Sequence, residues 1–493
     1  MSFNLRKLGM SFQWRLKLKS VVPILFLLTF IGVIVLDTFA PALAQFPAPQ
    51  PIPPIPQFPG QQPVPQPQFP QPVPLPVPLP QSPQFPPAET DGLPQPVPQP
   101  VPQPVPQPVP QPVPQPVPQP VPQPQPVPQP VRRVQRPGQE IRGVWMTNND
   151  LDILRDRTKV GEAMDKLRRL NFNTVYPVVW NSGYVMYPSA VAQRAEIQPF
   201  VYKGTDGHDI IADVINQAHR RGLLAIPWFE FGFMAPETSE LALNHPEWLT
   251  RKRDGSQTSI SAAGEVAWLN PFHPEVQRFI SDLVLEIVTK YDADGIQFDD
   301  HMSLPREFGY DRYTVSLYTQ ETGNPPPANH QDQAWMRWRA DKITAFMLQL
   351  NQAVKARKPN VIFSVSPNYY DFAYKFQLQD WLNWVRLNIV DELVMQVYRD
   401  DLNSFTAKLT RPEILETQQL NIPTGIGIMA GLRTRRIPIQ QIKSQVFAAK
   451  QRGLGVAFFY YESLWDTGPE DPGQRQQGFQ AIFPSPALRA RAD

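Results

Sequence analysis

The 493-residue chain contains no cysteine. This absence excludes a disulfide framework, thiolate metal ligands, a catalytic thiol and a lipid-modified cysteine. The chain also lacks a surplus of either charge, with 46 basic and 44 acidic residues and a formal net charge of +2. A near-neutral protein offers no basic surface for a phosphate backbone, so we expect no nucleic-acid partner.

The N-terminal segment is the one clearly basic part of the chain. Positions 6, 7, 15, 17 and 19 are basic, and an apolar run over residues 21–36 follows them. Ala42 and Ala44 then provide the small side chains that a signal peptidase requires. We predict a cleaved secretory signal peptide over residues 1–44, and without it the formal charge becomes slightly negative.

An uncleaved inner-membrane anchor is the alternative for this segment. Its apolar run is only slightly shorter than the roughly 18 residues of a bilayer span. Both interpretations place the rest of the chain outside the cytoplasm. We therefore expect an exported protein that is periplasmic, cell-wall associated or secreted.

Proline is distributed unevenly. Well over half of the 62 prolines lie between Phe46 and Pro137, where Gln-Pro-Val-Pro repeats with little variation. Proline fixes φ and removes a backbone donor, so this composition favours polyproline II and cannot form a core. We interpret residues 45–137 as a disordered linker, which at about 3.1 Å per residue extends to on the order of 250 Å. Such a spacer suits cell-wall or outer-envelope association better than recognition by proline-binding domains.

The remaining residues, 138–487, alternate short apolar runs with amphipathic stretches. Apolar runs of strand length are typical of buried parallel strands, and apolar residues at helical spacing indicate crossover helices. Eight repeats of this alternation predict an α/β fold, a (β/α)8 TIM barrel. The predicted strands cover residues 141–147, 174–180, 223–230, 294–300, 361–367, 392–398, 424–430 and 455–462. The clearest predicted helices cover residues 209–221, 274–291, 335–357 and 438–452.

An open doubly wound sheet is the alternative architecture. Such a sheet is expected to carry a glycine-rich phosphate loop after its first strand, and none follows Thr147. Two connections are unusually long, over residues 231–272 and 301–334. Both follow predicted strand C-termini, so we expect them to build up the rim where barrel active sites lie.

Four carboxylates lie at the predicted C-terminal ends of strands. Asp299 and Asp300 end the fourth strand, Glu230 ends the third, and Glu462 ends the eighth. Cleavage of a glycosidic bond needs one carboxyl that gives a proton to the leaving oxygen and a second that acts as nucleophile or base. These four acids are therefore the predicted catalytic residues.

Each of these acids also has another interpretation. Asp299 and Asp300 follow an alternating strand, so we expect them to face different sides, and one of them could cap the next turn. Glu230 lies within the apolar sequence IPWFEFGF, which favours a raised pKa, although a buried ion pair with an arginine is the alternative. Glu462 could instead anchor a sugar hydroxyl.

Further polar and aromatic residues fall at the same strand ends. Aromatic faces stack on the apolar faces of pyranose rings, so a ring of aromatic residues suits a polysaccharide cleft. Packing at the rim is the alternative for about half of them. The predicted substrate-binding residues are Trp145, Asn148, Trp180, Asn181, Trp228, His301, Asn368, Tyr369, Gln396, Tyr398 and Tyr461.

A metal site is a further interpretation of the fourth strand end. Asp299, Asp300 and His301 are all ligand types, but they are consecutive. Neighbouring side chains on a regular strand point to opposite faces, so the three should not converge on one ion. We therefore expect neither a metal nor another cofactor.

Several segments resemble the bacterial glycosyl-hydrolase-like family 10. They run in order from about Ile141 to Asp466 and read IRGVWMTN, AHRRGLLAIPWFEFGFMAP, WLNPFHPEVQ, DGIQFDDH, SVSPNYYDFAY and ELVMQVYRDD. The resemblance implies a (β/α)8 barrel hydrolase of bacterial polysaccharide, with cell-wall glycan strands as the leading substrate class. DGIQFDDH is similar to the family's DGIHFDDY segment, which makes Asp299 and Asp300 the most family-like acids. Glu230 departs from the asparagine of many relatives, so Glu230 and Glu462 rank behind.

The residues and the resemblance together favour a glycoside hydrolase. We expect it to cleave an envelope or extracellular polysaccharide, with peptidoglycan glycan strands first, through paired carboxylates. A wall-glycan-binding protein that has lost catalysis is one alternative. A metal-dependent polysaccharide deacetylase or amidase is the other.

Overall fold

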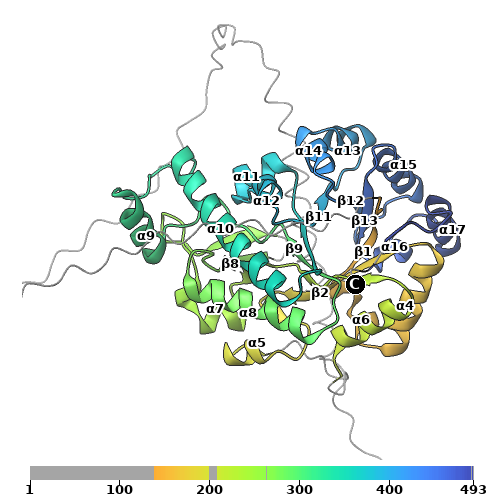
Figure 1. Ribbon diagram of the computed structural model, residues 1–493, viewed down its shortest axis with the longest axis horizontal. Coiled ribbons are helices and arrows are strands. Elements are labelled where there is room, and N and C mark those ends of the chain that lie inside the picture. The colour runs from red at the N-terminus through yellow and green to blue at the C-terminus, as the bar shows by residue number, and fades with distance from the viewer. Residues whose placement is uncertain (1–137, 199–207, 262–263, 490, 492–493) are drawn as a thin grey trace, which may run out of the picture. The chain divides into compact units, whose positions relative to one another are not determined.

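The computed structural model describes residues 138–198, 208–261, 264–489 and 491 (Figure 1). The predicted signal peptide and linker lie outside these residues, so both stay predictions. None of the helices in the described ranges combines the length and the apolar character needed to cross a bilayer.

Eight parallel strand positions form a closed barrel. They follow one another around the barrel in chain order, and β1 pairs with β2 on one side and with β13 on the other. The predicted (β/α)8 TIM barrel is therefore confirmed. Its strands are β1 (Arg142–Met146), β2 (Thr174–Asn181), β4 (Leu224–Ala225) with β5 (Trp228–Phe229), β9 (Gly295–Asp299), β10 (Ile362–Ser366), β11 (Glu392–Gln396), β12 (Thr424–Met429) and β13 (Gly455–Phe459).

The third strand position is broken at Pro227. Of its two pieces, β4 pairs with β2, whereas β5 pairs with both β2 and β9. Proline has no N–H to donate to a sheet, and here its carbonyl oxygen accepts from the Gln297 N–H at 2.8 Å. The strand predicted over residues 223–230 is thus two short segments, and the second ends one residue before Glu230.

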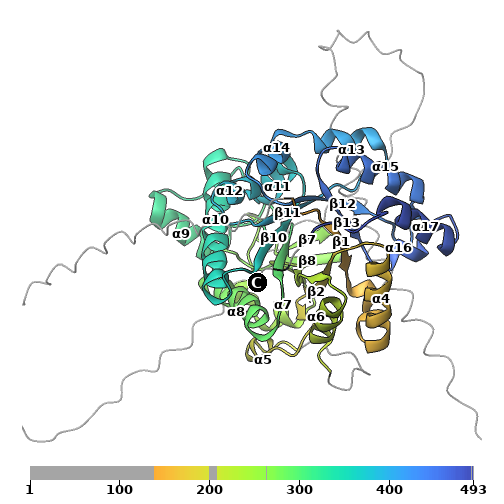
Figure 2. The ribbon, with the colours of Figure 1, turned by 45° about the vertical axis from the view of Figure 1, so that its right-hand side comes forward.

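Helices surround the strands, as Figures 1 and 2 show. The α6 helix illustrates why: its buried face is apolar, and the Asp209 side chain caps its first turn by accepting from the Ala212 N–H. The four predicted helices match α6, α8, α10 and α15 to within two residues. The longer helices are α4 (Arg157–Arg169), α6 (Ile210–Arg220), α8 (Pro274–Lys290), α9 (Arg312–Thr322), α10 (Gln333–Arg357), α15 (Ile439–Lys450) and α17 (Pro472–Ile482). The shorter ones are η2 (Asn148–Asp150), α3 (Leu151–Leu154), α5 (Ala190–Arg194), α7 (Glu240–Asn244), η3 (Pro246–Trp248), α11 (Tyr370–Gln377), α12 (Trp381–Arg386), α13 (Leu402–Leu409), α14 (Pro412–Gln419) and α16 (Ser463–Asp466).

The long connection after β5 folds into a small antiparallel sheet. Its strands are β6 (Met234–Pro236), β7 (Thr258–Ser261) and β8 (Gly264–Trp268), with β8 in the middle, and the remaining short strand, β3 (Tyr184–Val185), pairs with β2. Gly232 begins the connection with φ +48°, and a Cβ there would lie 2.4 Å from the backbone C and O of His301. The sheet was not predicted, although a rim structure at this place was. Its entry point presses directly on the loop that follows Asp299.

Loops after β12 and β13 are tied together by one buried arginine. The Arg475 guanidinium donates to the carbonyl oxygens of Ala430, Ile437, Ser463 and Leu464 and pairs with Glu470. Its side chain is fully buried. The last helix is thereby anchored to the rim of the barrel.

Replacing this arginine should destabilise the barrel strongly. Arg475→Met removes the positive charge that pairs with Glu470 and the donor to several buried carbonyls, so the free energy of unfolding should fall by about 3–5 kcal/mol. Urea denaturation checks this value. The matched control is Arg386→Met, because the Arg386–Glu416 pair has side chains 54% and 33% exposed and should contribute about 1 kcal/mol or less. Equal losses in the two variants would contradict the anchoring role.

Candidate active site

Three of the four predicted acids meet at the C-terminal mouth of the barrel. Asp299 is the last residue of β9, Asp300 follows it, and Glu230 follows β5. The pairing of β5 with β9 sets Phe229 opposite Phe298, so Glu230 and Asp299 are the next residues of neighbouring strands. All three side chains are buried, with relative exposures of 7% for Glu230, 4% for Asp299 and 9% for Asp300.

Glu230 has the properties of a proton donor. Burial, the hydrogen bond from Asn181 and the charges of Asp150 and Asp300 together bring its pKa to about 8: burial raises it most, the two charges add to the rise, and the hydrogen bond opposes it. That bond joins Asn181 Nδ2 to Glu230 Oε2 at 2.5 Å. The Glu230 carbonyl oxygen accepts from His301 Nδ1 at 2.9 Å, which fixes its backbone. At neutral pH this carboxyl therefore keeps its proton.

Asp299 is held by backbone and side-chain amides. Its Oδ1 accepts from Gln396 Nε2 and, at 2.6 Å, from the Asp300 N–H, while Gln379 Nε2 donates to its carbonyl oxygen at 3.0 Å. Burial raises the pKa of Asp299 well above its ordinary value, and the negative charge of Asp300 adds to the shift. Two neighbouring carboxyls in a low dielectric favour keeping a proton between them.

Asp300 is held by donors from the loop after β10. Its Oδ2 accepts from Asn368 Nδ2 at 2.6 Å and from Gln377 Nε2 at 3.3 Å. Asp299 and Asp300 are thus fixed by different groups, Asp299 from β11 and Asp300 from residues 368–377. The side chains that donate to the two carboxyls in these contacts are neutral amides, so none of them adds a positive charge beside the acids.

The argument against convergence of Asp299, Asp300 and His301 is corrected by the structure. One potential ligand atom of each residue lies within 4.8 Å of the others, because β9 ends at Asp299 and the next two residues are in a turn. His301 Nδ1 donates to a carbonyl oxygen and so carries a hydrogen, which leaves Nε2 as an acceptor. The three side chains can therefore supply metal ligands, and the expected absence of a metal stays a prediction.

Several predicted substrate-binding residues also position the acids. Asn148 Nδ2 donates to Asn181 Oδ1 at 2.5 Å, and Asn181 in turn donates to Glu230. Asn368 and Gln396 hold Asp300 and Asp299, as described above. Tyr398 is near all three acids. Burial raises the pKa of its hydroxyl well above the ordinary value, and the charges of Asp299, Asp300 and Glu230 add to the rise.

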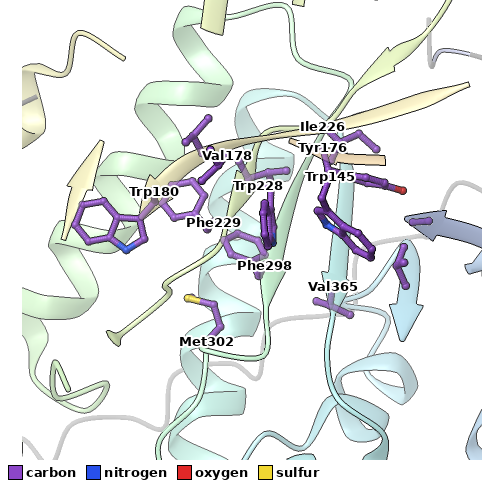
Figure 3. Packing of buried hydrophobic residues seen from close by; sticks show 14 of the residues in the cluster. Trp145, Tyr176, Val178, Trp180, Ile226, Trp228, Phe229, Phe298, Met302 and Val365 are labelled. Carbon is purple, nitrogen blue, oxygen red and sulfur yellow. The ribbon is translucent and has the colours of Figure 1, made fainter. Parts of the chain in front are cut away.

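The predicted aromatic platform is partly wrong. Trp180 donates from Nε1 to the Gly232 carbonyl oxygen at 2.9 Å and packs edge-on against Phe279 of α8, away from the mouth. Trp145 and Trp228 are almost fully buried and lie together, with ring centroids 6.1 Å apart, so they form the floor beneath the acids. Figure 3 shows these two rings close together and Trp180 apart from them.

A β-bulge explains the error at Trp180. The Tyr176 hydroxyl reaches Glu392 inside the barrel, and Asn181 also points to the interior, toward Glu230. Residues five apart would face opposite sides of a regular strand. The register of β2 against β5 shifts between Val178 and Trp180, which reverses the alternation and turns Trp180 outward.

Tyr369 and Tyr461 also have partners other than a sugar. Lys408 Nζ lies 3.6 Å from the ring centroid of Tyr369. The ring of Tyr461 packs edge-on against Trp465, and its N–H donates to the Trp145 carbonyl oxygen at 2.9 Å. Both tyrosines are buried, which fits the rim-packing alternative.

Glu462 lies apart from the other predicted acids. Its carboxylate pairs with Arg433, which also donates to the Asn149 carbonyl oxygen at 2.9 Å. The charges that raise the pKa of Glu230 are those of Asp150 and Asp300, not that of Glu462. The structure therefore gives Glu462 the role of joining the loops after β1, β12 and β13.

Asp150 is the acid that the sequence prediction missed. It is buried, and burial raises its pKa to about 7 even though the Thr147 and Glu462 N–H groups donate to it, each at 2.8 Å. The available signal was the Thr147-Asn148-Asn149-Asp150 sequence directly after β1, which forms a capping box. The glutamines at 377 and 379, which hold Asp300 and the Asp299 backbone, were also missed.

Comparisons with known proteins agree with this architecture. The family model described as glycosyl hydrolase-like 10 matches residues 140–449. Glycosyl hydrolase YngK of Bacillus subtilis strain 168 is 23% identical over 282 residues, which are 52% of this chain and 51% of YngK. Glycosyl hydrolase DigH of Escherichia coli strain K12 is 25% identical over 311 residues, which are 54% of this chain and 66% of DigH. The chain thus covers less than two thirds of either relative.

A solved structure shows the same fold. The glycoside hydrolase domain of PgaB (BpsB) from Bordetella bronchiseptica superposes with a TM-score of 0.54 at 16% sequence identity. The match covers 72% of this chain and 100% of that domain. At this identity the likeness concerns the barrel alone.

The raised pKa of Glu230 predicts a pH-dependent stability. Between the ordinary value of 4.5 and about 8, the folded state keeps a proton that the unfolded state releases, so stability falls as pH rises through this window. The Glu230→Gln variant has no ionisable group at this position, so it lacks this pH dependence. Its free energy of unfolding, relative to the native sequence, should therefore rise by on the order of a few kcal/mol between pH 5 and pH 8, since one pKa unit corresponds to about 1.4 kcal/mol. Urea denaturation of both proteins at both pH values gives these free energies. A difference between the two proteins that is the same at pH 5 and at pH 8 would contradict the raised pKa of Glu230.

Proposed function

Because the chain belongs to the glycosyl hydrolase-like 10 family, we propose that it hydrolyses glycosidic bonds of a bacterial envelope or extracellular polysaccharide. Peptidoglycan glycan strands are the first substrate to test. The observation that carries the proposal is the meeting of Glu230, Asp299 and Asp300 at the mouth of the barrel.

The acids divide into a proton donor and a charged partner. Glycosidic cleavage passes through an oxocarbenium-like transition state, which needs a proton on the leaving oxygen and a nucleophile or base on the other side of the sugar. Glu230, with a pKa of about 8, is protonated at neutral pH and is the proposed general acid. Asp300 is the proposed nucleophile or base, because both amide bonds go to its Oδ2 while Oδ1 lies 3.4 Å from His301 Nδ1. Burial and the negative charge of Asp300 raise the pKa of Asp299 beside it.

Unpaired acceptors beside the acids support a polyhydroxylated substrate. Asn148 Oδ1 and Gln377 Oε1 are shielded from solvent, and neither has a hydrogen-bond partner within the described part of the chain. Their amide nitrogens lead to Glu230, through Asn181, and to Asp300. Buried acceptors are normally satisfied, and sugar hydroxyls are suitable donors. Both relatives carry the name glycosyl hydrolase, which supports the same chemistry.

The proposed location is the cell envelope or the extracellular space. The signal-like segment over residues 1–44 and the Pro/Gln repeat that follows support it. The repeat would allow the barrel to act on a wall polymer at a distance from its attachment.

Removal of each acid tests the proposal directly. Glu230→Gln, Asp299→Asn and Asp300→Asn should each lower kcat on purified glycan strands by about 10²–10⁴-fold, as expected for general acid–base groups. Glu462→Gln is the matched control, since its carboxylate is paired with Arg433, and its kcat should stay within about tenfold. Chromatography of the released oligosaccharides gives the rates.

Other outcomes support the alternatives. Retained glycan binding with no products from the native protein would favour a binding module that has lost catalysis. The Asp299, Asp300 and His301 cluster would favour a metal-dependent deacetylase if activity disappeared with a chelator and returned with a divalent cation. Full activity in all three acid variants would remove these residues from the mechanism.

The pH dependence of kcat/KM should report the proton on Glu230. Activity should fall above about pH 8, where this carboxyl ionises. Asn181 stabilises the ionised form by donating to it, so Asn181→Ala should move the alkaline limb to higher pH. If the alkaline limb of the kcat/KM profile stays in place in Asn181→Ala, or moves to lower pH, the limb does not report the ionisation of Glu230.

A further inference from the structure

A chain of buried hydrogen bonds runs through the barrel from its base to the floor of the active site. Every member side chain is almost fully inaccessible to solvent. The members come from the C-terminal segment and from four strands. In order they are Arg489, Glu392 of β11, Ser364 of β10, Gln297 of β9 and Trp145 of β1.

An ion pair forms the base of this column. Arg489 Nη2 donates to Glu392 Oε2, and each of the two side chains is 1% exposed. Glu392 Oε1 also accepts from the Tyr176 hydroxyl and the Ser364 hydroxyl, each at 2.9 Å. The barrel was predicted to end at residue 487, but its contacts continue beyond that residue. Besides Arg489, the Leu488 carbonyl oxygen takes part by accepting from the Glu140 N–H at 3.1 Å. Arg489 supplies the positive charge that a buried carboxylate requires.

The middle of the column has one arrangement of donors. Ser364 gives its hydrogen to Glu392, so its oxygen accepts from Gln297 Nε2 at 2.9 Å. Gln297 Oε1 is then left to accept from Trp145 Nε1 at 2.7 Å. An indole N–H only donates, so a reversed Gln297 amide would leave two donors facing each other. The carboxylate at the base and the indole at the top therefore both require the same orientation of the Gln297 amide.

The top of the column touches the groups that hold the acids. A Cβ on Gly427 would lie 3.2 Å from both Trp145 Cη2 and Gln396 Cα, so the edge of the indole lies close to the residue that clamps Asp299. Trp145 also packs on Trp228, two residues before Glu230, and on Phe459, whose ring lies 5.7 Å from that of Tyr398. Figure 3 shows the neighbouring rings of Trp145 and Trp228.

We propose that Gln297 is a positioning residue for catalysis: through Trp145 it holds the floor beneath Glu230 and Asp299, and Ser364, Glu392 and Arg489 fix its orientation. It touches neither the acids nor a substrate. In its effect on turnover, this inference rests on the proposed glycosidase function. The coupling along the column does not depend on that function.

The kinetic test compares two variants that each leave one buried indole N–H without its acceptor. Gln297→Met does so at Trp145, and Thr344→Val does so at Trp384, where Thr344 Oγ1 accepts at 2.9 Å on the outer helices α10 and α12. Both should lower Tm. Gln297→Met should also lower kcat at least tenfold with KM changed less than twofold, whereas Thr344→Val should leave kcat within twofold.

A double-mutant cycle shows whether Gln297 acts through Trp145. In a Trp145→Phe background, which has no indole N–H, Gln297→Met should cause little further loss of kcat. Equal kcat losses in Gln297→Met and Thr344→Val, or independent effects of Gln297→Met and Trp145→Phe, would overturn the positioning role.

A spectroscopic measurement on the full chain tests the column without any substrate. The indole ¹H–¹⁵N resonance of Trp145, assigned with Trp145→Phe, should shift in Arg489→Met, while that of Trp384 should not. Ser364→Ala is a milder variant that interrupts the same column and should give a shift of the same kind. If neither variant moves the Trp145 resonance, the proposal fails, whereas shifts in a protein that cleaves no glycan would refute the glycosidase function and leave the column intact.

Discussion

Burial of like charges at neighbouring strand ends is the constraint on which the active site depends. Closure of eight parallel strands puts Glu230 and Asp299 at adjacent positions of β5 and β9, and Asp300 follows at once. In a low dielectric these carboxyls cannot all ionise, so protons remain in the cluster at neutral pH. The pKa values of Glu230 and Asp299 are raised as a result. Cleavage of a glycosidic bond requires such a retained proton for the leaving oxygen.

Amide side chains make this burial tolerable without removing the protons. Asn181, Asn368 and Gln396 each donate to one acid, and a positively charged partner in their place would lower the pKa of a carboxyl more than a neutral amide does. Cations are used where fixed structure is needed: Arg433 at the rim, Arg475 under the last loops and Arg489 at the base. The acids at the mouth of the barrel are held by neutral amide donors, whereas the ion pairs hold the surrounding structure together.

The barrel could be predicted from the sequence because its signals are local. Each strand is a short apolar run, and each main helix carries an apolar stripe, so element type follows from periodicity alone. The acids at the ends of β5 and β9 were predicted for the same reason. The break of the third strand at Pro227 was not predicted, although proline is a local signal. The antiparallel sheet after β5 was not predicted either, since it depends on contacts with distant segments such as the His301 loop.

Side-chain direction was the least predictable feature of the site. Trp180 was expected at the mouth, but one bulge in β2 reverses the alternation. Asp150 was missed because its importance comes from burial beneath the loop of Glu462, 312 residues away in the chain. Asn148, Asn368 and Gln396, expected as sugar contacts, also support the acids, because partners across the barrel decide their orientation.

Isotope incorporation during turnover tests the central claim most directly. Glycan strands digested in H₂¹⁸O should yield oligosaccharides with one ¹⁸O at each new reducing end, detected by mass spectrometry, and Glu230→Gln should abolish the incorporation. Oligosaccharides without ¹⁸O, or loss of acetyl groups from strands of unchanged length, would show that the carboxyls at this mouth do not hydrolyse a glycosidic bond.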